Sequence, residues 1–266
     1  MKILYTGASG RMAVALREAL EGEFDAVRLM VRRPPERLFA GEEAVIADLT
    51  DLEAVERACA GIDTVIHLGG IADEASFPEI LDANIVGTYH LYEAARRAGV
   101  RRVVFASSNH ATGFYPIEQR IRVEDPPRPD SYYGVSKVFG EALARLYYDK
   151  WGIESVCLRI GSFRDAPEDV RQLSIWLSPD DAAELIRRSV RAEHIGYLVA
   201  YGVSDNERSF WDNAEPSAAL GFIPRDRAED HAGSIGHSDV SHPFQGGLYC
   251  EPGYTGGSWV TRKPEA

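Results

Sequence analysis

The stretch Thr6-Gly7-Ala8-Ser9-Gly10-Arg11-Met12-Ala13 constrains the fold of this chain more than any other. It follows a short apolar run from Lys2 to Tyr5, typical of a strand, and precedes apolar residues at helical spacing from Met12 to Leu20. Glycines at such a junction permit a tight turn and let the backbone approach a pyrophosphate, which the N–H groups at the helix start favour. The Gly-x-x-Gly spacing is shorter than the usual fingerprint, with Ala13 at its third small position. The stretch predicts a dinucleotide-binding turn.

The rest of the chain alternates between apolar runs of strand length and segments with helical periodicity. Further strands are predicted at 26–31, 44–49, 63–71, 102–106, 152–159 and 196–201, and helices at 52–60, 84–98, 132–148, 180–191 and 216–220. This rhythm is typical of an α/β fold, here a Rossmann-type doubly wound parallel sheet with helices on both faces. We expect one domain over residues 1–266. Residues 1–160 would form its dinucleotide-binding core, and residues 161–266 mainly substrate-binding segments and a packed surface arm.

Polar or glycine-rich residues follow four of the predicted strands, namely Gly7–Gly10, Asp48, Gly69–Ile71 and Ser107–His110. Ligands of parallel sheets lie beyond the carboxyl ends of the strands, so these residues should converge on one edge. Asp48 is placed to approach an adenine. His67, inside an apolar strand, is expected to be a hydrogen-bonded core histidine.

The tip of the second strand reads Met30-Val31-Arg32-Arg33-Pro34 and holds no carboxylate. NAD-binding folds place an acidic residue near this tip to bind the ribose hydroxyls, whereas an arginine accommodates the 2′-phosphate of NADP. The two arginines are thus either a solvated loop or a site for NADP.

Tyr133 and Lys137 are four residues apart at the head of a predicted helix, so their side chains should be neighbours on one face. An ammonium beside a phenol favours the phenolate and lowers the tyrosine pKa from its ordinary value near ~10. The pair therefore predicts a general base, although the same spacing is common on solvated helix faces.

The bulk properties exclude several classes of protein. The net charge is −12, from 41 acidic against 29 basic residues, which repels phosphate backbones and argues against nucleic-acid binding. The three cysteines are far apart, so neither a disulfide framework nor a metal site is expected. No apolar run approaches the ~20 residues of a membrane span, and no signal peptide is visible, so we expect a cytoplasmic protein.

Together the motifs resemble the extended short-chain dehydrogenase/reductase superfamily, and more closely the bacterial uronate dehydrogenases. The superfamily match covers residues 1–165, through Thr6-Gly7-x-x-Gly10, Asp63-x-Val65-x-His67-Leu68, Asn84-x-x-Gly87-Thr88, Ser107-Ser108 and Tyr133-x-x-x-Lys137. The closer match spans nearly the whole chain and adds Arg159-Ile160-Gly161-Ser162, Trp211-Asp212-Asn213 and Phe244-Gln245-Gly246-Gly247.

The resemblance implies oxidation of D-glucuronate or D-galacturonate at C1 to the aldarolactone, with hydride passing to NAD. It implies that Tyr133 is the base, that Lys137 lowers its pKa and holds the nicotinamide ribose, and that Ser108 binds the reacting oxygen. Arg171 would bind the uronate carboxylate, because a guanidinium fork fits it in two-point geometry. The implied cofactor-binding residues are Gly7, Gly10, Arg11, Met12, Arg32, Asp48, Leu49, Leu68, Gly69, Gly70, Tyr133 and Lys137. The implied substrate-binding residues are Ile71, Ala72, Ser108, Asn109, His110, Tyr133, Ser162 and Arg171.

Two departures from the family pattern matter. A serine that touches the sugar in the family is replaced here by Ala72, and the carboxylate at the second strand tip is absent, which leaves NAD against NADP open. The alternatives are a nucleotide-sugar epimerase or dehydratase of the same superfamily, and a non-catalytic dinucleotide-sensing regulator. The former usually has a longer C-terminal part, and the latter would lack the Ser/Tyr/Lys set. Superfamily members usually self-associate, so a homo-oligomer is expected.

Overall fold

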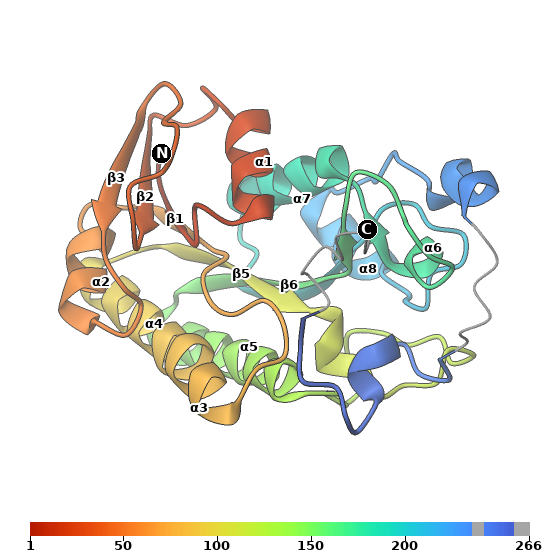
Figure 1. The fold of residues 1–266 in the computed structure, drawn as a ribbon. Coiled ribbons are helices and arrows are strands. Elements are labelled where there is room, and N and C mark those ends of the chain that lie inside the picture. The colour runs from red at the N-terminus through yellow and green to blue at the C-terminus, as the bar shows by residue number, and fades with distance from the viewer. Residues whose placement is uncertain (236–241, 258–266) are drawn as a thin grey trace, which may run out of the picture.

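A seven-stranded, fully parallel sheet forms the centre of the computed structural model, which describes residues 1–235 and 242–257 (Figure 1). The spatial order is β3-β2-β1-β4-β5-β6-β9, so the order reverses between β1 and β4. The strands are β1 Lys2–Thr6, β2 Ala26–Val31, β3 Glu42–Ile46, β4 Thr64–His67, β5 Arg102–Ser108, β6 Glu154–Ile160 and β9 Tyr197–Gly202. The predicted doubly wound parallel sheet is confirmed.

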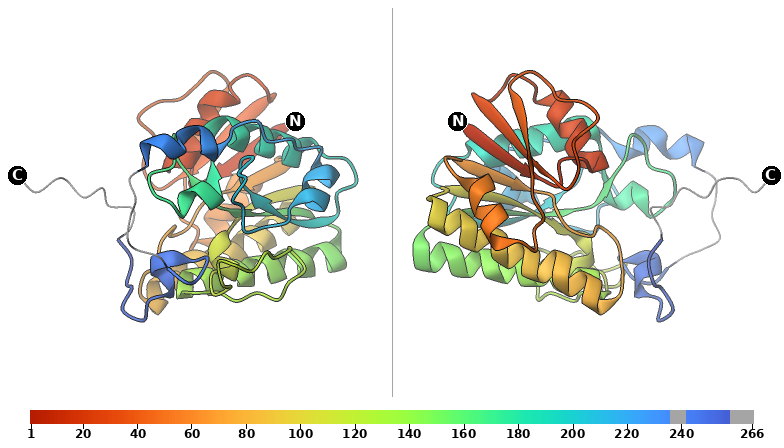
Figure 2. Two further views of the ribbon diagram at one scale, coloured as in Figure 1. Left: turned by 90° about the vertical axis from the view of Figure 1, so that its right-hand side faces the viewer. Right: turned by 60° about the vertical axis from the view of Figure 1, so that its left-hand side comes forward.

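Helices cover both faces of this sheet (Figures 1 and 2). One face packs against α1 Arg11–Ala19 and α7 Pro179–Arg191, and the other against α2 Leu52–Cys59, α4 Gly87–Ala98 and α5 Tyr132–Trp151. Each helix presents one apolar stripe to the sheet, and burial of apolar area drives this layering. His67 lies within the core as predicted. Its ring bonds Thr6 Oγ1 at 2.6 Å, and burial lowers its pKa to about 3.

Several predicted boundaries were wrong, and three of these errors affect the site. The strand after α4 extends to Ser108, because Ser107 and Ser108 still pair with β6. The fourth strand ends at His67, since Gly70 adopts φ +130° and turns the chain away. The helix predicted at 84–98 begins earlier, as α3 Phe77–Ile80 and a π-helical segment Leu81–Val86 that leads into α4.

The chain after Ile160 both completes the sheet and builds a separate region beside it (Figure 2). The former is the role of α7 and β9. The latter comprises a two-stranded sheet of β7 Ser162–Phe163 and β8 Trp176–Leu177, the short helices α6 Gln172–Ile175 and α8 Ala214–Leu220, and the 3-10 helices Ala228–Ser234 and Gly247–Cys250. A further 3-10 helix, Asn109–Thr112, directly follows β5. Residues 236–241 and 258–266 of the predicted surface arm lie outside the described residues. Across the part of the chain that is described, none of the helices combines the length and apolar character that a bilayer crossing needs.

Candidate active site

Tyr133 lies in the first turn of α5, and the Ser131 hydroxyl and the Glu74 carboxylate hold that turn. Ser131 caps the helix by accepting a hydrogen bond from the Gly134 N–H at 3.0 Å. The Glu74 carboxylate accepts from the backbone N–H groups of Tyr132 at 3.2 Å and Tyr133 at 2.8 Å. Satisfying these N–H groups fixes the backbone from which the Tyr133 phenol projects.

The Tyr133 phenol, the Ser108 hydroxyl and the Lys137 ammonium meet where β5 ends. The Ser108 hydroxyl is hydrogen-bonded to the Tyr133 phenol, and its Oγ also accepts from the His110 N–H at 3.2 Å. Lys137 Nζ lies 5.3 Å from the centre of the Tyr133 ring and donates to the Ala106 carbonyl at 2.8 Å. The structure therefore brings the three predicted catalytic side chains together.

The expected lowering of the Tyr133 pKa is wrong for the chain without a cofactor. Burial raises the pKa of this phenol to about 12, and outweighs the hydrogen bond from Ser108, which acts in the opposite direction. Burial likewise lowers the pKa of Lys137 to about 8. The negative charges of Asp130 and Asp73 also favour the neutral phenol. Tyr133 is therefore protonated in the chain alone.

The glycine turns after β1 and β4 touch each other and form a backbone floor at the point where the strand order reverses. Gly7 has φ +65°, and a Cβ there would lie 2.8 Å from the backbone of Gly69. A Cβ on Gly69 would lie 2.9 Å from both Leu49 Cδ1 and Thr6 Oγ1. The first turn of α1 contains no acidic residue and its N-cap, Gly10, provides no capping side chain. These features fit a pyrophosphate, which needs close backbone approach and unopposed N–H groups.

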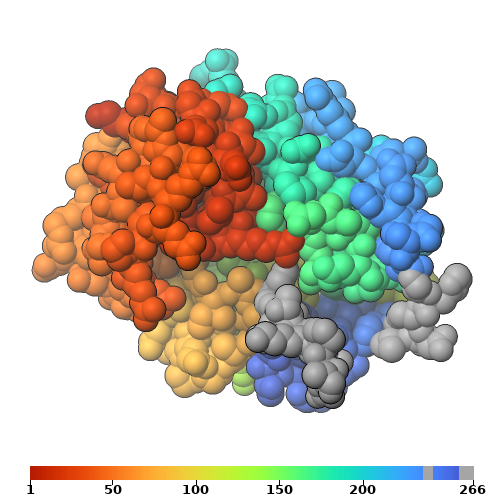
Figure 3. Space-filling model, turned by 45° about the horizontal axis from the view of Figure 1, so that its top comes forward, coloured from red at the N-terminus to blue at the C-terminus, as the bar shows by residue number. Residues whose placement is uncertain are grey.

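The other predicted dinucleotide contacts border this floor. Arg11, at the start of α1, reaches across to Asp165 at 3.8 Å. Figure 3 shows the red N-terminal part of the chain meeting the green part. Met12 and Leu68 are half-buried and pack against the same hydrophobic cluster, which includes Ala8 of the turn. Asp48 lies two residues beyond β3, not at its end as predicted, and accepts two hydrogen bonds from Thr50. The bond from the Thr50 backbone N–H is the main reason that the pKa of the Asp48 carboxyl is lowered.

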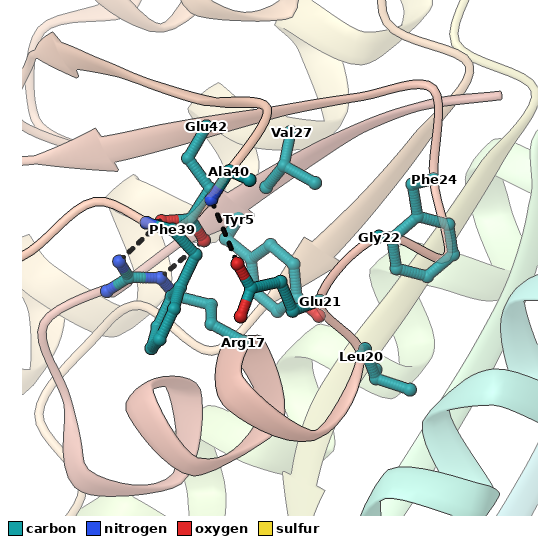
Figure 4. Close-up of a pocket in the computed structure, with 10 residues that line it drawn as sticks. All are labelled: Tyr5, Arg17, Leu20, Glu21, Gly22, Phe24, Val27, Phe39, Ala40 and Glu42. Carbon is teal, nitrogen blue, oxygen red and sulfur yellow. Dashed lines mark hydrogen bonds and ion pairs between the residues drawn. The ribbon is translucent and has the colours of Figure 1, made fainter.

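Arg32 and Arg33 are exposed at the start of the loop between β2 and β3. The Arg32 charge is close enough to Asp48 to contribute to its lowered pKa. The far end of the loop is held by Arg17 of α1, which binds the Glu42 carboxylate at 2.7 and 2.8 Å and the Arg37 carbonyl at 2.8 Å (Figure 4). Beneath it is a cavity of about 10 Å³, against which the buried Tyr5 hydroxyl lies without a hydrogen-bond partner in the described chain. A cavity of this size holds no more than about one water molecule.

Arg171 is half-buried and meets only uncharged oxygens in the described residues. Its Nε donates to the Gln245 carbonyl at 2.7 Å. With the Asn109 amide oriented to satisfy both its atoms, its oxygen accepts from Arg171 Nη2 at 3.1 Å and its nitrogen donates to the Ile160 carbonyl at 3.1 Å. Burial lowers the pKa of Arg171, against the negative charges of Asp169 and Asp130, and none of the ion pairs within 4.0 Å among the described residues involves Arg171. The guanidinium thus has an unfilled capacity for an anion.

The remaining predicted sugar contacts surround the same region. His110 packs edge-on against Tyr133 with ring centres 5.9 Å apart, and Ser162 is buried in β7. Asn84 accepts from the Ile71 N–H at 2.7 Å and donates to its carbonyl at 3.0 Å. Ala72 is exposed in the loop that follows, where it offers no polar group.

Sequence reasoning missed several residues that shape this site. Asn84, from the π-helical segment, joins the Ile71 loop to Ser136 of α5 at 3.0 Å. Tyr249, from the C-terminal arm, stacks on His110 with ring centres 3.6 Å apart, and its hydroxyl bonds Asp73. Asp130 was also missed. The Phe244-Gln245-Gly246-Gly247 motif was the only available signal that the arm reaches the site.

The comparisons with known proteins agree with this geometry. The model of the NAD dependent epimerase/dehydratase family matches residues 3–164, which include both glycine turns, Ser108, Tyr133 and Lys137. The chain belongs to this family.

Among curated relatives, this member of the epimerase/dehydratase family is 43% identical to a uronate dehydrogenase of Pseudomonas putida, over 95% of this chain and 96% of the relative. It is 37% identical to an L-arabinose 1-dehydrogenase (NAD(P)(+)) of Haloferax volcanii, over 85% and 97%. Among solved structures, it superposes with a TM-score of 0.89 on a tyrosine-to-alanine mutant of the uronate dehydrogenase from Agrobacterium tumefaciens, complexed with NAD. That pair is 42% identical and covers 94% of this chain and 96% of the other. The resemblance to the uronate dehydrogenases is confirmed.

Proposed function

We propose that this protein is a uronate dehydrogenase, which oxidises C1 of a hexuronic acid such as D-glucuronate or D-galacturonate to the aldarolactone. Arg171 is the observation that carries the proposal. Its guanidinium lacks a carboxylate partner in the described chain, and it contacts Asn109, which directly follows the Ser108 that bonds Tyr133. A carboxylate would complete the fork with two parallel charge-assisted hydrogen bonds. The three dehydrogenase relatives support the reaction class.

In the proposed reaction, the C1 hydroxyl gives its proton to Tyr133 and the C1–H pair leaves as hydride. NAD supplies the hydride acceptor when bound. Ser108 holds the reacting oxygen, and Lys137 keeps a positive charge beside the phenol and would hold the nicotinamide ribose. Since burial and the negative charges of Asp130 and Asp73 keep the Tyr133 proton in place, proton acceptance requires the additional charges of the complex with cofactor and substrate.

We propose that the cofactor is NAD and that NADP is also accepted, with its 2′-phosphate bound by Arg32 or Arg33. Membership of the NAD dependent family and the NAD complex of the Agrobacterium relative support the former. The two exposed arginines and the missing acidic residue at the end of β2 support the latter, because a 2′-phosphate needs a cation and no repelling carboxylate. Initial rates with each cofactor at saturating uronate measure the preference.

The test of the function compares charged and neutral sugars. We expect reduced-cofactor absorbance to appear with glucuronate and galacturonate, and far lower kcat/KM with glucose, galactose and L-arabinose. Arg171→Ala should raise KM for uronates and remove most of this discrimination, whereas Arg122→Gln, at an exposed arginine paired with Asp212, should change neither. No signal with either cofactor would overturn the proposal. Unchanged uronate kinetics in Arg171→Ala would overturn the carboxylate assignment, and a preference for neutral sugars would indicate an aldose dehydrogenase.

We also propose that the protein is a homo-oligomer with one domain per chain. Exposed apolar side chains gather on α3 and α5, where Phe77 and Tyr132 are 47% and 52% exposed and their rings lie 5.4 Å apart. Val135 is 45% exposed one turn further along α5. Light scattering of wild type and a Phe77→Ser/Val135→Ser variant measures the subunit number, and a monomeric wild type would contradict this part.

A further inference from the structure

Asp130 is a buried carboxylate beside the sugar site to which neither the family motifs nor the proposed reaction assigns a role. Its side chain is fully buried. Oδ2 lies 2.7 Å from His110 Nδ1, and Oδ1 accepts a hydrogen bond from the Ser131 hydroxyl at 2.8 Å. Ser131 is the N-cap of α5, so Asp130 connects His110 with the start of the helix that carries Tyr133.

The surroundings of Asp130 are built closely around this carboxylate. A Cβ on Gly113 would lie 1.7 Å from Oδ2, and one on Gly246 would lie 2.1 Å from the same atom. A Cβ on Gly134 would lie 3.2 Å from Oδ1. Three glycines from separate segments thus leave room for the carboxylate. Such packing holds Asp130 in one orientation.

His110 is held on its other sides as well. The Tyr249 ring stacks on it at 3.6 Å with an interplanar angle of 24°, and Tyr133 meets it edge-on. The Tyr249 hydroxyl is bound by Asp73, which also accepts from the Tyr254 hydroxyl at 2.8 Å. His110 Nε2 has no hydrogen-bond partner within the described residues. The ring therefore has a fixed plane, one nitrogen bound to Asp130 and the other available to a ligand.

We propose that Asp130 is a positioning residue that sets the tautomer of His110, so that Nε2 accepts a hydrogen bond from a sugar hydroxyl. An ionised carboxylate only accepts hydrogen bonds, so Nδ1 must carry the proton that joins them. In the neutral ring the lone pair is then on Nε2. The Arg171 guanidinium interacts electrostatically with Asp130 as well. His110 then selects for a sugar hydroxyl that donates a hydrogen bond, and this role rests on the proposed sugar substrate.

The tautomer can be measured without any catalytic assay. In the full-length chain with ¹⁵N-labelled histidine, we expect the His110 signals of a neutral ring protonated at Nδ1 at pH 7.5. Asp130→Asn, whose amide is able to donate, should shift the ring toward the Nε2–H form. Ser131→Ala, which keeps the carboxylate and removes its other hydrogen bond, should leave the tautomer unchanged. An Nε2–H or doubly protonated ring in the wild type would overturn the proposal, and this spectrum decides the question even if Asp130→Asn does not fold.

Kinetics then test the role of that tautomer. A set of monodeoxyfluoro glucuronates removes one hydroxyl donor at a time and keeps a weak acceptor. Fluorine at the position whose hydroxyl donates to His110 should lower the kcat/KM of the wild type by about tenfold or more. Asp130→Asn and His110→Ala should have nearly the same kcat/KM for that fluoro sugar as for glucuronate. NAD affinity should be equal in all three proteins. Equal fluorine sensitivity of wild type and Asp130→Asn would overturn the role. Absence of any uronate turnover in the wild type would instead overturn the proposed function, with the tautomer assignment still decided by the spectrum.

Discussion

Two buried or half-buried arginines near the ends of the central strands have opposite environments. Arg159, in β6, binds the Glu141 carboxylate through two hydrogen bonds of 2.9 and 2.8 Å, and both side chains are almost fully buried. Arg171, before α6, meets only the oxygens of Gln245 and Asn109 in the described chain. One guanidinium has its counter-ion within the fold, and the other does not.

We propose that this difference separates an arginine that supports the fold from one that binds an anionic ligand. A buried charge is costly unless it is paired, so most internal arginines carry a carboxylate, as Arg17 does with Glu42 and Arg102 with Glu154. Glu141 additionally accepts from the Ser107 hydroxyl at 2.6 Å, next to Ser108. Glu141 and Arg159 thus support the end of β5 that carries Ser108, whereas Arg171 is proposed to gain its counter-ion from a bound anion.

The largest expected effect is a loss of turnover when Tyr133 is substituted. Tyr133→Phe removes the proposed proton acceptor and should lower kcat by about 10³-fold or more. Its free energy of unfolding should change by about 1 kcal/mol at most, because only the hydrogen bond with Ser108 is lost. Stopped-time assays and denaturant unfolding measure the two quantities, with Tyr132→Phe at the exposed neighbouring position as control. Retained turnover would remove Tyr133 from the reaction.

Substitution in the buried Glu141–Arg159 pair should instead mainly lower the free energy of unfolding. Glu141→Gln leaves Arg159 as an uncompensated buried charge and should lower the free energy of unfolding by about 3–5 kcal/mol. Arg171→Gln removes a cation that has no carboxylate partner in the described chain, and should change stability by about 1 kcal/mol or less. Urea unfolding of both variants tests the comparison directly. Equal losses of stability would show that Arg171 also has a mainly structural role.

Lys137 is an intermediate case, because it is buried and has no carboxylate partner among the described residues. Burial lowers its pKa to about 8 in the folded chain, against about 10.4 when unfolded. Below pH 8 the folded chain therefore carries a penalty of about 3 kcal/mol, which disappears as the pH rises from 8 toward about 10.4. The stability advantage of Lys137→Met over wild type should shrink across this window.

Denaturant unfolding at pH 7 and pH 9.5 measures that advantage, and Lys150→Met, at an exposed lysine of the same helix, is the matched control. A gap between Lys137→Met and wild type that stays constant with pH would contradict the burial effect. Activity of Lys137→Met should be lost at both pH values, since the charge beside Tyr133 is removed.

The smallest predicted effect refines the Arg171 site. Arg171→Lys keeps the charge but loses the planar fork, so a two-point contact becomes a single one. KM for glucuronate should rise by about tenfold, which corresponds to one charge-assisted hydrogen bond of about 1.5 kcal/mol. The kcat should be nearly unchanged. A KM equal to that of Arg171→Ala would indicate that fork geometry, rather than charge, accounts for the whole contribution.

The sequence predicted the features that depend on local pattern. Apolar periodicity and glycine placement determined the parallel sheet, the turn from Gly7 to Gly10 and the Tyr133–Lys137 helix face. Even so, the boundaries at His67 and Ser108 were wrong, because ladder hydrogen bonds and a positive φ at Gly70 decide them rather than apolarity. The family motifs supplied the roles expected of Ser108 and Arg171, which periodicity alone could not assign.

Only the tertiary structure decided which charges are paired and what reaches the site from far along the chain. Arg159 and Arg171 look alike as residues, and the difference arises because Glu141 lies opposite one and Gln245 opposite the other. The Tyr133 pKa likewise depends on burial, which reversed the direction expected from Lys137 as a sequence neighbour. Pairing and desolvation are sums over contacts between distant segments, so the sequence determined the fold and its turns, while the folded chain determined the electrostatics of the site.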